Sequence, residues 1–139
     1  MIASRHQVTV EWGHCDPAGI VYFPNYFSYF DSSTNALFLH ALGLNKYQML
    51  KKYDLVGIPV VDVAARFILP SVFGDVVTIE STVVEIKRSS FQMRHRLLKD
   101  ETLAIEAHET RVWVGRDPVA PDKLKGKPLP EDVIARLKG

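Results

Sequence analysis

Asp16 is the acidic side chain whose setting suits it best for chemistry. It lies within residues 13–23, a loop punctuated by proline and glycine in which Gly19 can take a positive φ at little cost. Pro24 follows and suits the first turn of a helix. A carboxylate in such a loop can attack a carbonyl carbon directly or act as a general base toward water. An aspartate before a proline is also a common turn former, so a purely structural role stays open on the residues alone.

The start of the predicted helix supplies a second ingredient for acyl chemistry. The first amides of a helix lack intrahelical partners and, together with the helix dipole, favour incoming negative charge. Pro24 has no N–H, so the backbone N–H of Phe23 is the candidate donor for a developing oxyanion. One such donor contributes about 3–4 kcal/mol in a typical oxyanion hole. An acid side chain and backbone amides would suffice, without a metal or a cofactor.

His14 and Cys15 flank Asp16 and raise two rival sites. The side chains of three adjacent residues diverge, and no spaced set of His, Cys and Asp residues supports them as metal ligands. The same divergence argues against a cysteine nucleophile with histidine as its base. We therefore expect no metal at this loop.

A polar turn further along the chain is a candidate phosphate-binding segment. It comprises Lys87, Arg88, Ser89 and Ser90, at the end of a predicted strand. Two cations and two hydroxyls could hold phosphate groups. A charged turn is more often only solvated, and both interpretations stay open.

The pattern of apolar residues predicts one strand, one long helix and then a series of strands. Residues 6–12 alternate with period two, whereas residues 23–42 repeat apolar and aromatic side chains at steps of three and four, typical of a largely buried helix that Gly43 would cap. A shorter helix is predicted for residues 46–53. Further strands are predicted at 58–69 (mostly buried), 76–87, 91–99 and 103–114, and a last short helix near 131–138.

These elements predict a single α+β domain over residues 1–139. A curved antiparallel sheet of about five strands, mostly a meander, would wrap the long central helix. One such sheet leaves an apolar helix only partly covered, so we expect at least a homodimer.

The composition excludes several classes of protein. The net charge of +1 gives no global field for nucleic acid, and no stretch approaches the roughly 20 apolar residues of a membrane span. The single cysteine allows no intrachain disulfide, and the amino-terminal residues lack the apolar run of a signal peptide. We expect a cytoplasmic protein that contacts neither nucleic acid nor membrane.

Residues 14–26, with the sequence HCDPAGIVYFPNY, resemble the signature loop of the 4-hydroxybenzoyl-CoA thioesterase family. Supporting similarity runs through residues 57–61, 74–80 and 87–91, so nearly the whole chain apart from its tail is covered. The resemblance implies the hotdog fold, hydrolysis of a coenzyme A thioester, and a homodimer or homotetramer with active sites at subunit interfaces. It also implies that Asp16 is the catalytic carboxylate and that no cofactor is needed, since coenzyme A is part of the substrate.

The resemblance adds candidates for substrate binding. An acid at the place of Asp31 helps to bind the polar end of the acyl group in the family, although a solvated helix residue is an equal alternative. Tyr22 of the signature and Tyr47 of the second helix are candidates for contacts with the substrate, although plain packing is the more common role for a residue such as Tyr47. The phosphate role of residues 87–90 gains weight in the same way.

Two functions remain in view. The first is an acyl-CoA thioesterase for a small acyl group, for example an aromatic one such as 4-hydroxybenzoyl, since the predicted helix is rich in aromatic side chains. The second is a non-catalytic module that binds acyl-CoA or acyl-carrier protein on the same fold. The presence of Asp16 in its motif favours the enzyme, because a binding module has no need of an acid there. A hotdog dehydratase would need a pocket histidine paired with a helix acid, and no histidine occupies such a place.

Overall fold

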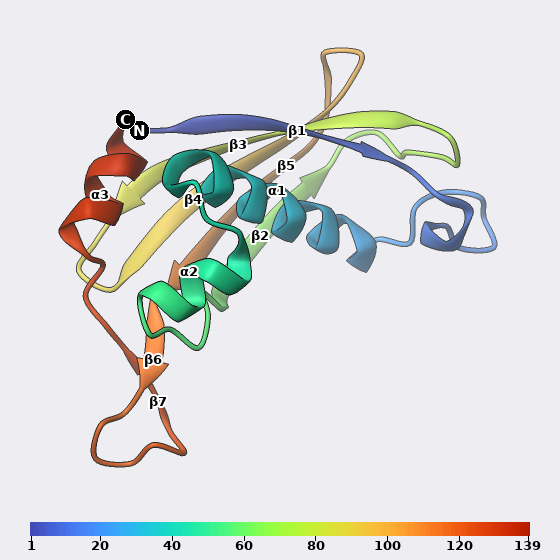
Figure 1. Cartoon of the computed structure of the whole chain (residues 1–139). Coiled ribbons are helices and arrows are strands. Elements are labelled where there is room, and N and C mark those ends of the chain that lie inside the picture. Colours follow the sequence, from blue (N-terminus) through green and yellow to red (C-terminus); the bar gives the residue numbers. More distant parts are fainter.

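The computed structural model describes residues 1–139 and shows one long helix lying across a curved antiparallel sheet (Figure 1). The sheet has five strands in the order β1-β3-β4-β5-β2. The expected helix wrapped by about five antiparallel strands is therefore confirmed. The strands are β1 (Ala3–Thr9), β2 (Val60–Phe67), β3 (Val76–Ile86), β4 (Ser90–Lys99) and β5 (Thr102–Val112).

The long helix, α1 (Pro24–Leu42), has the bounds that its sequence signals predict. Pro24 occupies the first turn, where a missing N–H costs nothing, and Gly43 ends the helix in the left-handed conformation with φ of 69°. Apolar and aromatic residues of α1 form two core clusters with the inner face of the sheet. This buried helix fixes the position of the loop that precedes it.

The strands β3, β4 and β5 form the predicted meander. Asp100 and Glu101 make the two-residue turn between β4 and β5, both with positive φ, which matches the twist of a tight hairpin. The two outer strands come from elsewhere in the chain: β1 pairs with β3, and β2 pairs with β5. Each outer strand has one edge without a partner in the chain.

Some predicted boundaries differ from the structure. The first strand ends at Thr9 instead of residue 12, because Trp12–His14 form a turn of 3-10 helix in which the Glu11 and His14 side chains cap each other's backbone N–H groups. The strand predicted to be mostly buried, β2, is exposed along nearly its whole length in the single chain. That prediction was wrong for one chain, because α1 packs mainly against β1 and β3 and leaves most of this edge uncovered.

The remaining elements flank the sheet. They are α2 (Lys46–Lys52), α3 (Glu131–Lys138) and a small hairpin of β6 (Val114–Arg116) with β7 (Leu124–Gly126) that the sequence did not predict. Both helices were expected. No helix in the structure has the length and apolar character needed to cross a lipid bilayer.

Candidate active site

The loop that carries Asp16 is clamped by backbone hydrogen bonds across its base. The Asp16 N–H donates to the Ile20 carbonyl at 2.9 Å, and the Tyr22 N–H donates to the His14 carbonyl at 2.9 Å. Gly19 has a φ of 81° and closes the turn by donating its N–H to the Asp16 carbonyl at 2.9 Å. The loop is thus folded back on itself immediately before α1.

The carboxylate of Asp16 combines a turn-forming contact with a free oxygen. Its Oδ1 accepts a hydrogen bond from the Ala18 N–H at 2.9 Å, as in an Asx turn. Its Oδ2 has no hydrogen-bond partner within the chain, and the residue is only half-buried. The structural role is therefore real, and it orients one oxygen while leaving the other available.

The first residues of α1 leave one amide uncommitted. The N–H groups of Asn25 and Tyr26 donate to the carbonyls of Tyr22 and Phe23 at 2.8 and 3.1 Å. Pro24 has no N–H, and the Phe23 N–H has no acceptor within the chain. Phe23 N–H is therefore the unpaired donor at the helix start, as predicted from the position of the proline.

An apolar groove of about 240 Å³, which we call the loop groove, lies beside this loop. One wall comes from the signature loop and α1, and the other from the end of β2 and the residues after it. Its lining is Ile20, Val21, Phe23, Tyr26, Phe67, Ile68, Leu69 and Pro70. An apolar wall next to an unpaired amide suits the acyl end of a thioester better than it suits a charged group.

The histidine of the loop has a structural role. His14 Nδ1 accepts from the Glu11 N–H at 3.1 Å and lies 2.8 Å from the Tyr29 hydroxyl, and burial raises the pKa of Tyr29 to about 12. Cys15 Sγ is directed toward the Glu11 carbonyl at 3.7 Å. His14 contacts Glu11 and Tyr29, and Cys15 contacts Glu11. The two side chains do not contact each other, so the structure does not form a Cys–His pair.

A second groove, of about 340 Å³, surrounds Asp31, and we call it the charged groove. Three charged residues, Asp31, Lys46 and Arg111, line it together with apolar side chains from the start of β2 and from β6 and β7. Arg111 Nη1 lies 3.1 Å from Asp31 Oδ1, and the Asp31 side chain is 52% exposed. Asp31 is therefore neither a lone buried acid nor a freely solvated one.

A buried hydrogen-bond network fixes Arg111 on the side away from Asp31. Its Nε donates to Glu109 Oε1 at 2.7 Å, and the same oxygen lies 3.0 Å from His95 Nε2. Burial raises the pKa of Glu109, but the hydrogen bond from His95 and the charge of Arg111 outweigh it, so the net pKa is lowered. Glu109 is thus an ionised acceptor that fixes the guanidinium facing Asp31.

The network continues away from the groove into the core. His95 is fully buried and stacks on Phe30, with ring centroids 5.0 Å apart. Its Nδ1 lies 2.7 Å from Ser81 Oγ, which lies 2.6 Å from Ser33 Oγ. The sequence did not point to Glu109 and Arg111, although they share the strand phase of Ile105, which is buried.

The other predicted binding residues do not gather around Asp16 in one chain. Tyr22 is exposed next to Phe23, whereas Tyr47 on α2 is 73% exposed and does not line either groove. Residues 87–90 form the turn between β3 and β4, closed by the Lys87 N–H donating to the Ser90 carbonyl at 2.8 Å. Lys87 and Arg88 are exposed and form no ion pair.

The turn at residues 87–90 and the Asp16 loop lie at opposite ends of the sheet. The Asp16 loop follows β1, whose last residue pairs with the first residue of β3, whereas the turn follows the last residue of β3. The 11 residues of β3 span about 35 Å. Within one chain, these predicted phosphate contacts cannot reach a thioester at Asp16.

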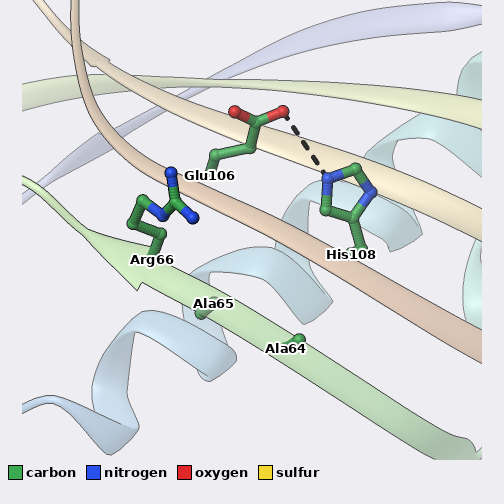
Figure 2. A pocket seen from close by; sticks show the side chains of 5 residues that line it. All are labelled: Ala64, Ala65, Arg66, Glu106 and His108. Carbon is green, nitrogen blue, oxygen red and sulfur yellow. Dashed lines mark ion pairs between the residues drawn. The ribbon is translucent and has the colours of Figure 1, made fainter.

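The helix-free face of the sheet carries a third, polar hollow of about 340 Å³. Figure 2 shows Arg66, Glu106 and His108 standing on this face above β2 and β5, with the small side chains of Ala64 and Ala65 on β2 beside them. His108 Nε2 lies 3.5 Å from Glu106 Oε1. None of these residues lines the loop groove or the charged groove, so this hollow is separate from both.

The loop groove and the charged groove lie at the two ends of β2. Phe67, the last residue of β2, lines the first groove, and Val60, the first residue, lines the second. The eight residues of the strand span about 25 Å. The unpaired Phe23 amide and the Asp31 carboxylate therefore belong to grooves at opposite ends of β2.

Comparison with known proteins gives consistent similarities. The profile of the thioesterase-like superfamily matches residues 10–137. The chain is 35% identical over 134 residues to 4-hydroxybenzoyl-CoA thioesterase of Pseudomonas sp. (strain CBS-3), covering 92% of each chain. It is 27% identical over 118 residues to 1,4-dihydroxy-2-naphthoyl-CoA hydrolase of Microcystis aeruginosa (strain NIES-843 / IAM M-2473), covering 85% of this chain and 80% of that protein.

A solved structure is similar over almost its whole length. It is an aspartate-to-asparagine mutant of 4-hydroxybenzoyl-CoA thioesterase complexed with 4-hydroxybenzoyl-CoA. The TM-score is 0.87 at 30% identity, and the match covers 97% of this chain and 98% of that one.

Proposed function

The chain belongs to the thioesterase-like superfamily and is a hotdog-fold thioester hydrolase, and on that premise we propose that it cleaves a small acyl-coenzyme A with Asp16 as its catalytic carboxylate. The products are the free acid and coenzyme A. The observation that supports the assignment of the site is that one loop, which borders an apolar groove, carries two polar groups without partners in the chain. These are the free oxygen of Asp16 and the unpaired N–H of Phe23.

The proposed reaction uses these two groups in turn. The thioester carbonyl oxygen accepts a hydrogen bond from the Phe23 N–H at the start of α1, where the helix dipole favours the charge that develops on it. Asp16 then attacks the carbonyl carbon to give a mixed anhydride that water hydrolyses, or it removes a proton from an attacking water. Either way the thiolate of coenzyme A leaves, and the reaction needs no cofactor.

The complete site in this proposal is shared by two chains. The helix-side residues of β2 are apolar yet exposed, and its outer edge has unpaired backbone groups. Antiparallel pairing of β2 with β2 of a second copy places the end of one strand beside the start of the other. The loop groove of one chain then meets the charged groove of its partner, with Asp16 and Asp31 contributed by different chains.

The same pairing accounts for the scattered binding residues. The turn at residues 87–90 lies at the end of the sheet where Arg111 pairs with Phe91, which is also the end of the charged groove. In the proposed dimer this turn lies nearer to the Asp16 loop of the partner chain than to its own. We propose that Lys87 and Arg88 bind phosphates of coenzyme A there. Tyr47 lies near the same end on α2 and Tyr22 beside the oxyanion donor, so both remain candidates for substrate contact.

The proposed acyl group is small and aromatic. The two relatives are named for action on 4-hydroxybenzoyl-CoA and 1,4-dihydroxy-2-naphthoyl-CoA. A groove of about 240 Å³ with apolar walls suits a ring better than a long lipid chain, and a carboxylate at the far end suits a ring hydroxyl. We therefore propose a hydroxylated aryl-CoA such as 4-hydroxybenzoyl-CoA, with coenzyme A as the carrier in place of acyl-carrier protein.

A thiol-release assay over aryl, short-chain and medium-chain coenzyme A thioesters tests the proposal. We expect hydrolysis to be fastest with aryl-CoA, and we expect Asp16→Asn to lower kcat by roughly 10²–10⁴-fold while the protein stays folded. Asp122→Asn, in an exposed loop, is the matched control and keeps the wild-type rate. A folded Asp16→Asn variant with near-normal turnover would contradict the role of Asp16, and no thiol release from any thioester would point to the binding module instead.

A single-turnover reaction in water labelled with oxygen-18 separates the two chemical routes. Attack by Asp16 on the carbonyl carbon gives a mixed anhydride, and water that opens this anhydride at the Asp16 carbon leaves label in the Asp16 carboxylate, so label there identifies this route. General-base catalysis puts the label only in the product acid. Mass spectrometry of the protein after one turnover reads the difference.

A further inference from the structure

Lys46 is a half-buried cation of the charged groove with no acid partner. Its Nζ makes one long hydrogen bond of 3.4 Å to Asn35 Oδ1, a neutral amide, and it forms no ion pair. Arg111 in the same groove differs, because two carboxylates, Glu109 and Asp31, match its charge. The groove therefore presents one ammonium whose hydrogen-bonding capacity is mostly unused.

Helix geometry places this ammonium beside Asp31. Asn35 follows Asp31 by four residues on α1, so the two side chains stand on the same helix face with Cβ atoms about 5–6 Å apart. Lys46 reaches Asn35 from the first turn of α2 and so lies along the same wall. Burial lowers the pKa of Lys46, with Asp31 opposing and Arg111 reinforcing the change, which agrees with a cation drawn in among these groups.

The two side chains offer complementary hydrogen bonds to a ligand. Asp31, with one oxygen held by Arg111, accepts hydrogen bonds, whereas the ammonium of Lys46 donates them. The surrounding wall is apolar and includes Ile58, Pro59 and Val60, so a ligand group there is partly removed from water. A ligand with a single polar group can form a good hydrogen bond with either Asp31 or Lys46. A ligand with two neighbouring oxygens can form hydrogen bonds with both.

We propose that Lys46 is a specificity-determining residue and that the charged groove recognises an acyl group with two adjacent oxygen substituents. One substituent is a hydroxyl that donates to Asp31, and the other is an oxygen that accepts from the Lys46 ammonium. A 3,4-dihydroxyaryl ring is the simplest acyl group of this class. The inference rests on the proposed thioesterase function and narrows its substrate.

The test compares kcat/KM for 3,4-dihydroxybenzoyl-CoA and 4-hydroxybenzoyl-CoA in the wild type and in Lys46→Met. We expect the wild type to favour the dihydroxy substrate about tenfold, the value of one charge-assisted hydrogen bond in a partly wet site. Lys46→Met brings the ratio close to one, and Lys46→Arg, which keeps a cation, restores part of it. Lys51→Met, an exposed lysine of the same helix, is the matched control and keeps the wild-type ratio.

Inhibition by the free acids gives a second readout that needs no turnover of the acid itself. We expect 3,4-dihydroxybenzoate to inhibit the wild type more strongly than 4-hydroxybenzoate, and Lys46→Met to remove that difference. The Lys46 side chain takes no part in capping α2, which Asn45 does, so the variant keeps its helix.

The outcomes distinguish this inference from the proposed function. A wild type that hydrolyses 4-hydroxybenzoyl-CoA without preferring the dihydroxy substrate would overturn the role of Lys46 and leave the thioesterase assignment intact. Equal losses for both substrates in Lys46→Met would overturn it as well. A wild type that releases no thiol from any coenzyme A thioester would overturn the proposed function and this inference together.

Discussion

At the scale of single residues, the least expected feature is a charged pair inside the sheet. Glu109 and Arg111 are both almost fully buried and lie 2.7 Å apart, with His95 on the other side of the carboxylate. Removing two charges from water is costly, and the cost is offset only when the geometry is good and the remaining hydrogen-bonding groups find partners. Arg111 meets that condition through the Ile58 carbonyl at 3.2 Å and through Asp31.

We expect Glu109→Gln to lower the free energy of unfolding by about 3–5 kcal/mol, because it leaves the Arg111 charge buried without its inner partner. The pH dependence has a defined sign. The pKa of Glu109 is lowered below its ordinary value of 4.5, so its contribution is fully present above that value and is lost as the pH falls through the folded-state pKa. Urea unfolding between about pH 6 and pH 3 measures both effects.

The matched control for this variant is Glu106→Gln, on the same strand but on the helix-free face (Figure 2). Its expected effect is within about 0.5 kcal/mol, since Glu106 is partly exposed and its partner is a surface histidine. If both variants lost stability equally, or if Glu109→Gln kept the acid sensitivity of the wild type, the buried pair would not be the source of this pH-dependent stability.

The sequence pointed to the Asp16 loop and its unpaired amide, whereas it did not point to the buried charges of β5. Asp16 and the Phe23 amide follow from one loop and one proline, because their signal is local. Glu109 and Arg111 gain their importance from α1 and β4, which are distant in sequence. One feature of the sequence could have identified them. Both residues lie on the same face of β5 as its buried apolar residues, and a charged side chain on that face needs a partner.

At the scale of elements, β2 combines apolar side chains with exposure. Val60, Val63 and Phe67 pair with β5 residues that face α1, yet each remains more than 40% exposed, because α1 does not cover this edge. The sequence predicted the strand and its apolar character correctly. It could not show that the cover is missing from the chain itself, since a burial pattern looks the same whether the covering atoms come from one chain or from two.

We expect Val63→Asp to convert the protein into a folded monomer with little thioesterase activity. A charge at the centre of β2 would be buried without a partner in the dimer but stays in water in the single chain, where Val63 is 42% exposed. Light scattering coupled to size-exclusion chromatography measures the mass, and circular dichroism measures the fold.

Val84→Asp controls for the added charge. Val84 is 41% exposed, and it lies on β3, a strand with partners on both edges. We expect this variant to remain dimeric and active. A Val63→Asp protein that keeps the dimeric mass would show that the chains associate through another surface.

Elements with strong local signals were predicted closely, and those that depend on distant contacts were not. The ends of α1 follow from Pro24 and Gly43, which the structure confirms. The hairpin of β6 and β7 was missed because its strands have three residues each, and Pro118 and Pro121 lie in the loop between them. Its pairing also depends on β6 contacting Gly57, far away in the sequence.

At the scale of the whole molecule, the main feature is the separation of Asp16 from Asp31 along β2. A site shared between chains predicts complementation between two damaged proteins. We expect Asp16→Asn and Asp31→Ala to be nearly inactive toward 4-hydroxybenzoyl-CoA when pure. After subunit exchange, half of the dimers are mixed and each carries one intact site, so activity returns to about a quarter of the wild-type value.

Mixing each variant with itself under the same exchange conditions is the control. Recovery is expected only in the Asp16→Asn and Asp31→Ala mixture, because only there can one site receive both wild-type residues. If a verified heterodimer had no activity, the two aspartates would serve a site within one chain, and the two-chain arrangement would be wrong.

The placement of the two grooves at opposite ends of β2 also has a consequence for how the enzymatic activity depends on protein concentration. In the proposed two-chain site, each chain carries half of the groups, so we expect a folded monomer to be inactive and the catalytic rate per chain to depend on the fraction of chains that are in dimers. At protein concentrations near the dissociation constant of the dimer, we expect the specific activity to fall on dilution. The circular dichroism signal of the helices stays constant. In that arrangement, a low concentration of the chain is expected to switch the activity off while every molecule stays folded.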